Sequence, residues 1–180
     1  MKLTLKDGSV KEYQGPVTAA EAAKDLSMGL YRAACAARVD GKVVDLRTVL
    51  DHDCALEILT FADEDGQRAF NHTASHILAQ AVTHLYPEAK FAIGPAIDNG
   101  FYYDFDLPAP FTMEDLEKLE KEMAAIVKAD LPLEKFELDA AEALELMKDQ
   151  PYKEELIREH AGKGEKISFY RQGDFTDLCA

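Results

Sequence analysis

A run of apolar residues spaced for a single helix most strongly constrains the fold of this chain. Between His72 and Pro87 the apolar side chains recur three and four residues apart, as on one face of an α-helix. That face consists of Ala74, Ile77, Leu78, Ala81, Val82 and Leu85. His72, His76 and Thr83 fall on the opposite side. Because the apolar face is complete without them, the two imidazoles face either solvent or a cleft made by another part of the chain.

Composition indicates a chain that buries a real core in a reducing compartment. The 180 residues are 47% hydrophobic, enough for one mid-sized domain or two small ones. The three cysteines are widely spaced and form no CxxC pair, which argues against a disulfide framework or a zinc knuckle. No segment has the length of a membrane span, and the first ten residues do not form a secretory signal. We therefore expect a cytoplasmic protein without membrane contact.

The net charge of -14 is concentrated after residue 62. Residues 1–62 carry 8 Lys and Arg against 9 Asp and Glu, whereas residues 63–180 carry 12 against 25. Such an acidic surface repels phosphate backbones, which argues against tight binding to bulk nucleic acid. Any nucleic-acid contact is therefore expected to be local.

Residues 1–62 have the pattern of a small β-grasp domain. Asp7-Gly8 separates two alternating runs and predicts a β-hairpin, and Thr18 and Glu21 form a capping box that begins a helix ending near Met28-Gly29. Further strands are expected at residues 33–39, 42–45 and 55–61. The segment 62–66 has no periodicity and is the expected linker.

Residues 63–180 predict a second, α+β domain with a mostly antiparallel sheet and packed helices. The histidine helix is expected to end near Tyr86, followed by short strands separated by turns at Gly94-Pro95 and Asn99-Gly100. Capping boxes at Thr112 and Asp139 begin two more helices, reaching residues 129 and 149. A short helix is expected at 152–160, and strands at 89–93, 101–105, 131–138 and 166–171.

Taken alone, the candidate chemical groups leave alternatives open. Histidines at i and i+4 can ligate one metal ion or flank one substrate atom, but exposed histidines at this spacing are common. Cys179 is either a third polar group or a small core residue. Asp104 and Asp106 alternate with aromatics, as on a half-exposed strand edge. The residues alone predict a β-grasp module joined to an α+β domain with a candidate His/His/Cys cleft.

Two motifs carry a resemblance to a known family. The segments Asn71-His-Thr-Ala-Ser-His76 and Ile93-Gly-Pro-Ala-Ile-Asp-Asn-Gly-Phe-Tyr-Tyr-Asp-Phe-Asp106 resemble the amino-terminal region of the bacterial threonyl-tRNA synthetase family. The resemblance extends to Pro151-Tyr-Lys-Glu-Glu-Leu-Ile157 and Asp174-Phe-Thr-Asp-Leu-Cys179. Residues 1 to about 61 look like its TGS domain and the remainder like its editing domain, which removes serine wrongly attached to threonine tRNA.

The resemblance implies a set of site residues. Catalytic roles fall on His72, His76, Lys153 and Asp177, and substrate binding on Cys179, Tyr103 and Asp104. We expect no metal, although His72, His76 and Cys179 are the ligands if zinc binds. A histidine that follows the cysteine in the family lies beyond Ala180, so one wall of the pocket is expected to be missing.

The resemblance also implies partners and cofactors. The expected partner is the acceptor end of tRNA(Thr) carrying serine, and no cofactor is expected for this stretch. ATP, magnesium and zinc, and a homodimer contact, belong to the family's catalytic core. The alternatives are a free-standing editing deacylase of the alanyl type, or a non-catalytic module that binds a ligand or RNA.

Overall fold

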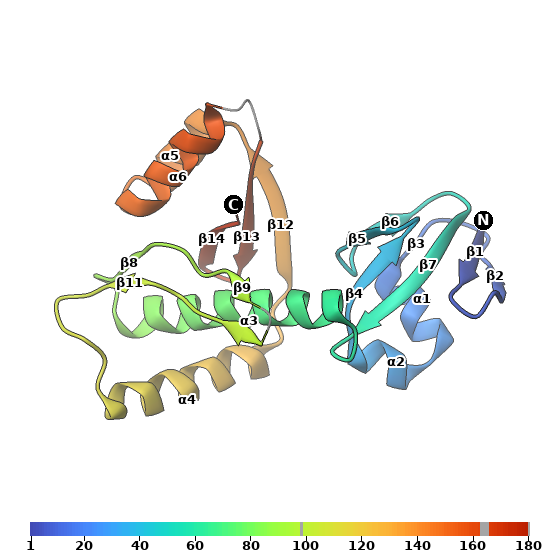
Figure 1. The fold of residues 1–180 in the computed structure, drawn as a ribbon, viewed down its shortest axis with the longest axis horizontal. Helices are drawn as coiled ribbons and strands as arrows, with labels where there is room; N and C mark the ends of the chain where they lie inside the picture. Colours follow the sequence, from blue (N-terminus) through green and yellow to red (C-terminus); the bar gives the residue numbers. More distant parts are fainter. Residues whose placement is uncertain (98, 163–165, 180) are drawn as a thin grey trace. The chain divides into compact units, whose positions relative to one another are not determined.

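The computed structural model describes residues 1–97, 99–162 and 166–179 (Figure 1). These residues form two compact units. The first consists of Met1–His72 with Ala96–Gly100, and the second of Thr73–Pro95 with the chain from Phe101 onward. Helix α3 (Glu64–Leu85) runs from one unit into the other. It begins at Glu64, inside the segment expected as the linker, and the domain boundary at residue 62 stays a prediction.

The first unit is a β-grasp fold, as expected. Its sheet has the order β2-β1-β7-β4-β5, in which β1 and β7 are parallel and the other pairs antiparallel. The hairpin at Asp7-Gly8 and the Thr18 capping box are both confirmed. The elements are β1 (Lys2–Leu5), β2 (Val10–Glu12), α1 (Ala19–Leu26), β4 (Ala34–Val39), β5 (Lys42–Val44) and β7 (Cys54–Thr60).

Two features of this unit were not expected. Helix α1 ends at Leu26, and a second helix, α2 (Met28–Ala33), starts where we had placed the stop. Its start is explained by Ser27, whose hydroxyl accepts a hydrogen bond from the Leu30 N–H. The short strands β3 (Val17–Thr18) and β6 (Val49–Leu50) also pair, which two-residue segments do not reveal by periodicity.

The second unit contains an antiparallel sheet with a different core on each face. Strands β12 (Leu133–Leu138), β13 (Ile167–Gln172) and β14 (Phe175–Cys179) pair in that order. On one face, Phe169 and Leu178 pack with residues of α5 (Ala140–Leu146) and α6 (Pro151–Ala161). On the other face, Phe175 joins the core that contains Ala79 and Val82 of α3.

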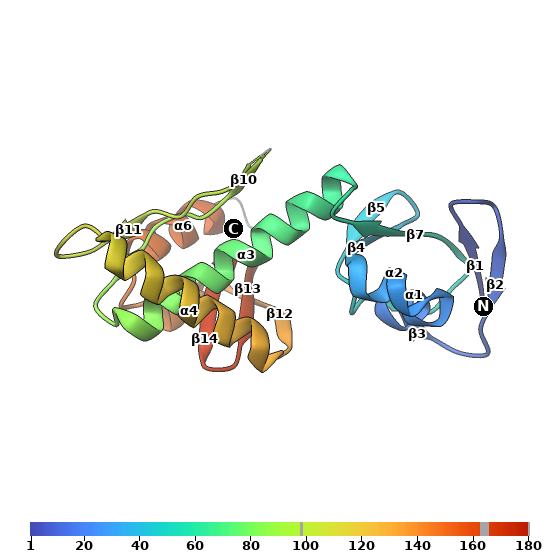
Figure 2. The ribbon, with the colours of Figure 1, turned by 90° about the horizontal axis from the view of Figure 1, so that it is seen from below.

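Helix α4 (Met113–Ala129) lies alongside α3 in this unit (Figure 2). It begins at the predicted Thr112 capping box and contributes Leu119 and Ile126 to the core around α3. At the end of α3, the His84 ring contacts Glu122 of α4 at 2.6 Å. Helix α5 is shorter than expected, ending at Leu146.

Helix α3 is buried on more than its apolar face. Ser75, His76 and Gln80, which lie outside that face, are 0%, 4% and 2% exposed, whereas Leu85 of the apolar face is 37% exposed. The amphipathic pattern therefore predicts correctly that the apolar face of α3 packs into a core. It does not show that the opposite face of the helix is also covered. Solvent exposure of His76, one of the two alternatives, is excluded.

The segment 90–106 forms an interrupted hairpin rather than three strands with two turns. Strand β8 (Lys90–Phe91) pairs with β11 (Phe105–Asp106), and β9 (Ala96–Ile97) pairs with β10 (Gly100–Phe101). Gly94 and Pro95 lie between β8 and β9, so the turn expected there was wrong. Gly94 instead makes room for an aromatic ring, since a Cβ at this position would lie 2.1 Å from the Tyr103 ring. The turn expected at Asn99-Gly100 lies next to Asp98, which is outside the described residues.

Within the described residues, no helix is long and apolar enough to cross a membrane.

The contact at Gly94 generates a stability prediction. Gly94→Ala should lower the free energy of unfolding by about 1–3 kcal/mol, because the added methyl must displace the packed Tyr103 ring. Urea denaturation monitored by circular dichroism measures this change. Gly15→Ala is the matched control, since no atom lies within 4 Å of its added Cβ. Equal stability of the two variants would contradict the packing described here.

Candidate functional site

The candidate site is centred on His76, which α3 carries into the interior of the second unit. Its Nδ1 lies 2.9 Å from Oδ2 of Asp177, a residue 101 positions later in the chain. Both side chains are almost fully buried, at 6% and 5% exposure. An imidazole with one nitrogen held by a carboxylate is fixed in orientation, which also fixes the direction of its other nitrogen.

Strand β14 places two functional side chains on the same face. Asp177 and Cys179 are two residues apart, and side chains of a strand alternate between its faces. In the neighbouring strand β13, Tyr170 lies opposite Asp177 and Ser168 opposite Cys179. The ring of Tyr170 also contacts His76, with centroids 5.6 Å apart.

Lys153 and Tyr103 complete the set of groups around Asp177. The Lys153 ammonium is 2.9 Å from Oδ1 of Asp177, and it donates to the Tyr103 hydroxyl at 2.9 Å. That hydroxyl donates in turn to Oδ2 of Asp177 at 2.7 Å. Lys153 is only 3% exposed, although lysine is rarely buried without a partner. One carboxylate therefore connects side chains from α3, β14, α6 and the 90–106 hairpin.

The charges of this group follow from burial and from the neighbours. Burial acts to lower the pKa of His76, but Asp177 and Cys179 outweigh it and raise the pKa to about 9. Burial acts to raise the pKa of Asp177, but His76 and Lys153 hold it below its ordinary value. Burial and the Asp177 charge raise the pKa of Tyr103. At neutral pH the group contains an imidazolium, a carboxylate and a neutral phenol.

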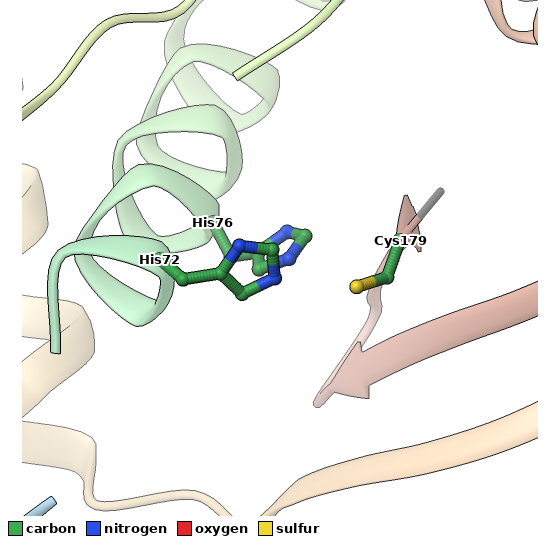
Figure 3. A group of neighbouring side chains, drawn as sticks. All are labelled: His72, His76 and Cys179. Atoms are coloured by element: carbon green, nitrogen blue, oxygen red, sulfur yellow. The ribbon is translucent and has the colours of Figure 1, made fainter. Parts of the chain in front are cut away.

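His72 and Cys179 lie next to this buried group. His72 is one turn before His76 on α3, so the helix itself sets their spacing. Both imidazoles project from α3 toward the side on which Cys179 lies (Figure 3). Ligand atoms of His72, His76 and Cys179 are all within 4.8 Å of one another. His72 and Cys179 are partly exposed, so this side of the group is the one a substrate can reach.

The donor set of this trio is one that zinc accepts. Tetrahedral zinc has bonds of about 2.0–2.3 Å, so its ligand atoms lie roughly 3.3–3.8 Å apart. The observed limit of 4.8 Å means that the three groups would have to close slightly around an ion. His76 already has the carboxylate partner typical of a zinc-bound imidazole. The residue types fit zinc, and the spacing fits it only after a small movement.

Six of the seven predicted site residues lie together. Asp104 does not join them, because it is exposed and its backbone pairs with Ala92 and Ile93. Successive side chains of an extended segment point to opposite sides, so Asp104 points away from Tyr103. Tyr170 is a neighbour that we did not predict. Tyr170 lies opposite Asp177 in the antiparallel pair of β13 and β14. Finding it from the sequence would have required the register of these two strands.

Comparison with known protein families identifies the domain at the start of the chain. Residues 1–60 match the TGS domain family. Residues 1–60 of the first unit are therefore a TGS domain, in agreement with their β-grasp fold.

Whole-chain relatives identify the particular family of proteins. The chain is 58% identical, over its full length, to the threonine-tRNA ligase of Acetivibrio thermocellus. Identity is 56% with the same enzyme of Clostridium perfringens and 54%, over 99% of the chain, with that of Clostridioides difficile. The chain spans 28% of the length of each of these relatives. Its sequence is similar to the amino-terminal region of bacterial threonine-tRNA ligases.

The electrostatics of the site predict the effect of Asp177→Asn on His76. Without the carboxylate charge, Cys179 alone opposes the effect of burial, so the pKa of His76 should fall from about 9 towards its ordinary value of 6.5. Titration of the imidazole protons by NMR measures this shift. Asp174→Asn, next to His84, is the control and should leave His76 unchanged.

The same pairing predicts a pH dependence of stability. The folded-state pKa of His76 lies above its ordinary value of 6.5, so its contribution is complete below pH 6.5 and is lost as the pH rises through about 9. Unfolding free energies measured from pH 6 to 10 should decrease over this range, and less so in Asp177→Asn. A parallel decrease in both proteins would contradict the assignment.

Proposed function

We propose that this chain hydrolyses seryl-tRNA(Thr), and that it is the proofreading region of a threonine-tRNA ligase. The observation that supports this most is the buried Asp177 cluster, defined as His76, Tyr103, Lys153 and Asp177, next to His72 and Cys179. A buried charged network beside partly exposed polar groups suits acid and base chemistry better than simple binding.

The need for such a site follows from the size of the amino acids. Serine lacks one methyl group of threonine, and a pocket large enough for threonine rejects serine by only about 1–3 kcal/mol. A second site that is too small for threonine can remove serine after the error. The half-buried Cys179 and Tyr170 are placed to limit the space next to the imidazoles.

Hydrolysis requires a group that takes a proton from water. His76 is protonated at neutral pH, because its pKa is about 9, so it donates rather than accepts. We therefore assign the base to His72, one helical turn away, acting on a water held between it and Cys179. The ester carbonyl gains negative charge during attack, and the imidazolium of His76 and the ammonium of Lys153 stabilise it.

The remaining predicted residues bind the substrate. Cys179 and the Tyr103 hydroxyl contact the seryl group, and Asp177 orients His76 and Lys153. Asp104, exposed next to Tyr103, is kept as a contact to the bound tRNA end. His72 takes a proton from the water as the water oxygen forms a C–O bond to the ester carbonyl. The ester C–O bond then breaks, and protonated His72 gives the proton to the leaving ribose oxygen, so that serine and a free ribose hydroxyl are released.

The proposed partner is the acceptor end of tRNA(Thr), in the cytoplasm. The net charge of -14 makes strong binding of the tRNA body by this chain unfavourable, so other parts of a ligase would hold it. ATP, magnesium and zinc are assigned to the aminoacylation core of such a ligase, along with a homodimer contact. The editing step itself needs none of these.

His72→Ala tests the proposed base. Deacylation of seryl-tRNA(Thr) should fall about 10²- to 10⁴-fold, because the water loses its proton acceptor, and His72→Ala/His76→Ala should fall at least as far. The assay uses this chain. His84→Ala, on the same helix, is the control and should keep its rate.

Two results would contradict the proposal. Unchanged hydrolysis after replacing both histidines would exclude them from catalysis. Equal hydrolysis of seryl- and threonyl-tRNA would exclude a proofreading role. Binding of a ligand or RNA without any hydrolysis would favour the non-catalytic module.

Measuring the zinc content of the purified protein tests whether the proposed mechanism works without zinc. We expect purified protein to contain well under one zinc ion per chain, and a chelator to leave deacylation unchanged. Mass spectrometry of the native protein and atomic absorption measure the content. If wild-type protein contains stoichiometric zinc, and Cys179→Ser loses both the zinc and the deacylation activity, then His72, His76 and Cys179 are zinc ligands and the metal-free mechanism is wrong.

A further inference from the structure

We infer that Gln150 is a positioning residue, which fixes Lys153 of α6 against Tyr103 of the 90–106 hairpin. The predicted effect of Gln150 on the reaction rate rests on the proposed hydrolysis, whereas its structural role does not. Lys153 and Tyr103 come from elements 50 residues apart, and their 2.9 Å contact depends on how α6 meets the hairpin. Gln150 is the residue immediately before α6.

The amide of Gln150 joins the edge of strand β8 as a peptide group would. Its Oε1 accepts from the Phe91 N–H at 2.8 Å, and its Nε2 donates to the Ala89 carbonyl at 3.3 Å. Residues 89 and 91 present these groups on the same edge of an extended segment. The other edge of β8 pairs with β11. The start of α6 is therefore bonded directly to the backbone of the hairpin.

The hairpin transmits this position to Tyr103 through packed rings. Phe91 meets Tyr103 edge-on with centroids 6.0 Å apart, and Phe105 stacks on Tyr103 at 4.8 Å. Gly94 leaves no free space behind the same ring. A shift of the β8 backbone therefore moves Tyr103, because close-packed rings have little room to adjust.

The helix transmits the position to Lys153. The Gln150 carbonyl accepts from the Glu154 N–H at 3.0 Å, so Gln150 begins the hydrogen bonding of α6. Pro151 occupies the first turn, where its fixed φ stiffens the entry to the helix. Gln150 makes no side-chain cap, because its amide is used on β8 instead. Lys153 follows within one turn.

Two other contacts join the same elements, but both are exposed. Lys90 Nζ donates to the Asp149 carbonyl at 2.8 Å, and the Tyr152 hydroxyl donates to Asp106 at 2.9 Å. Exposed contacts compete with water and contribute little to geometry. Gln150 is half-buried and bonds backbone groups of buried residues, so its loss leaves a buried N–H unpaired.

Chemical labelling of lysines tests the inference without any substrate. In Gln150→Ala, acetylation of Lys153 by an amine-reactive ester, read by peptide mass spectrometry, should rise about tenfold, because α6 separates locally from β8. Gln150→Glu keeps the acceptor for Phe91 and loses the donor, so it should give an intermediate rate. Tyr152→Phe, which removes an exposed contact of the same helix, should match wild type. Lys148, 62% exposed, reports overall reagent reactivity.

Hydrolysis of seryl-tRNA supplies the second readout. Gln150→Ala should lower kcat about 10- to 100-fold, because the substitution misplaces the Lys153 ammonium relative to the reacting groups. In a Lys153→Ala background, Gln150→Ala should change the rate less than about twofold, since it acts through Lys153. If Gln150 only stabilised the fold, Gln150→Ala would lower the rate by the same factor in wild type and in Lys153→Ala.

The outcomes separate the two proposals. Unchanged Lys153 labelling in Gln150→Ala, with the thermal unfolding midpoint unchanged, would overturn the role of Gln150. Increased labelling of Lys153 together with the half-buried Lys11 of the first unit, and a lower unfolding midpoint, would also overturn it, in favour of general destabilisation. If the wild-type protein does not hydrolyse seryl-tRNA, the proposed function fails, and the labelling result still decides the role of Gln150.

Discussion

The second unit depends on one buried carboxylate. A charge removed from water is tolerated only when it is paired and hydrogen-bonded, and Asp177 meets both conditions through His76, Tyr103 and Lys153. These donors come from three different elements, so the interaction holds α3, α6 and the hairpin in one arrangement. Loss of any donor leaves a buried charge with too few partners, which makes the arrangement cooperative.

The charged groups of the cluster connect the structure to the proposed chemistry. The His76 imidazolium and the Lys153 side chain both face the Asp177 carboxylate in a region with little water. Under the proposed hydrolysis, these preorganised donors stabilise negative charge on a carbonyl oxygen without rearrangement of solvent. In that proposal, the raised pKa that makes His76 a proton donor leaves the role of base to its neighbour His72.

Packing on both sides of α3 makes this geometry possible. Its apolar face packs with α4 and the hairpin, and its polar face meets strand β14, which presents Phe175, Asp177 and Cys179 on one side. Sequence analysis identified the apolar face correctly because helical periodicity is local. It could not show that the polar face is covered, because the covering strand begins about 90 residues later. The interrupted hairpin had the same cause, since ring contacts around Tyr103 decided it. Helix α2 differs, because its start depends on the local Ser27 cap, which sequence analysis missed.

The sequence by itself determined the order of elements, the capping boxes at Thr18, Thr112 and Asp139, and the residue types of the site. These depend on neighbours within one turn or one strand, so their spacing is visible in the chain. Tertiary structure alone decided which groups meet. It buried His76 and Lys153, brought Asp177 between them, excluded Asp104 from the cluster, and placed Gln150 on the edge of β8. Distances between residues far apart in the chain are set by packing and strand register, which no local pattern contains.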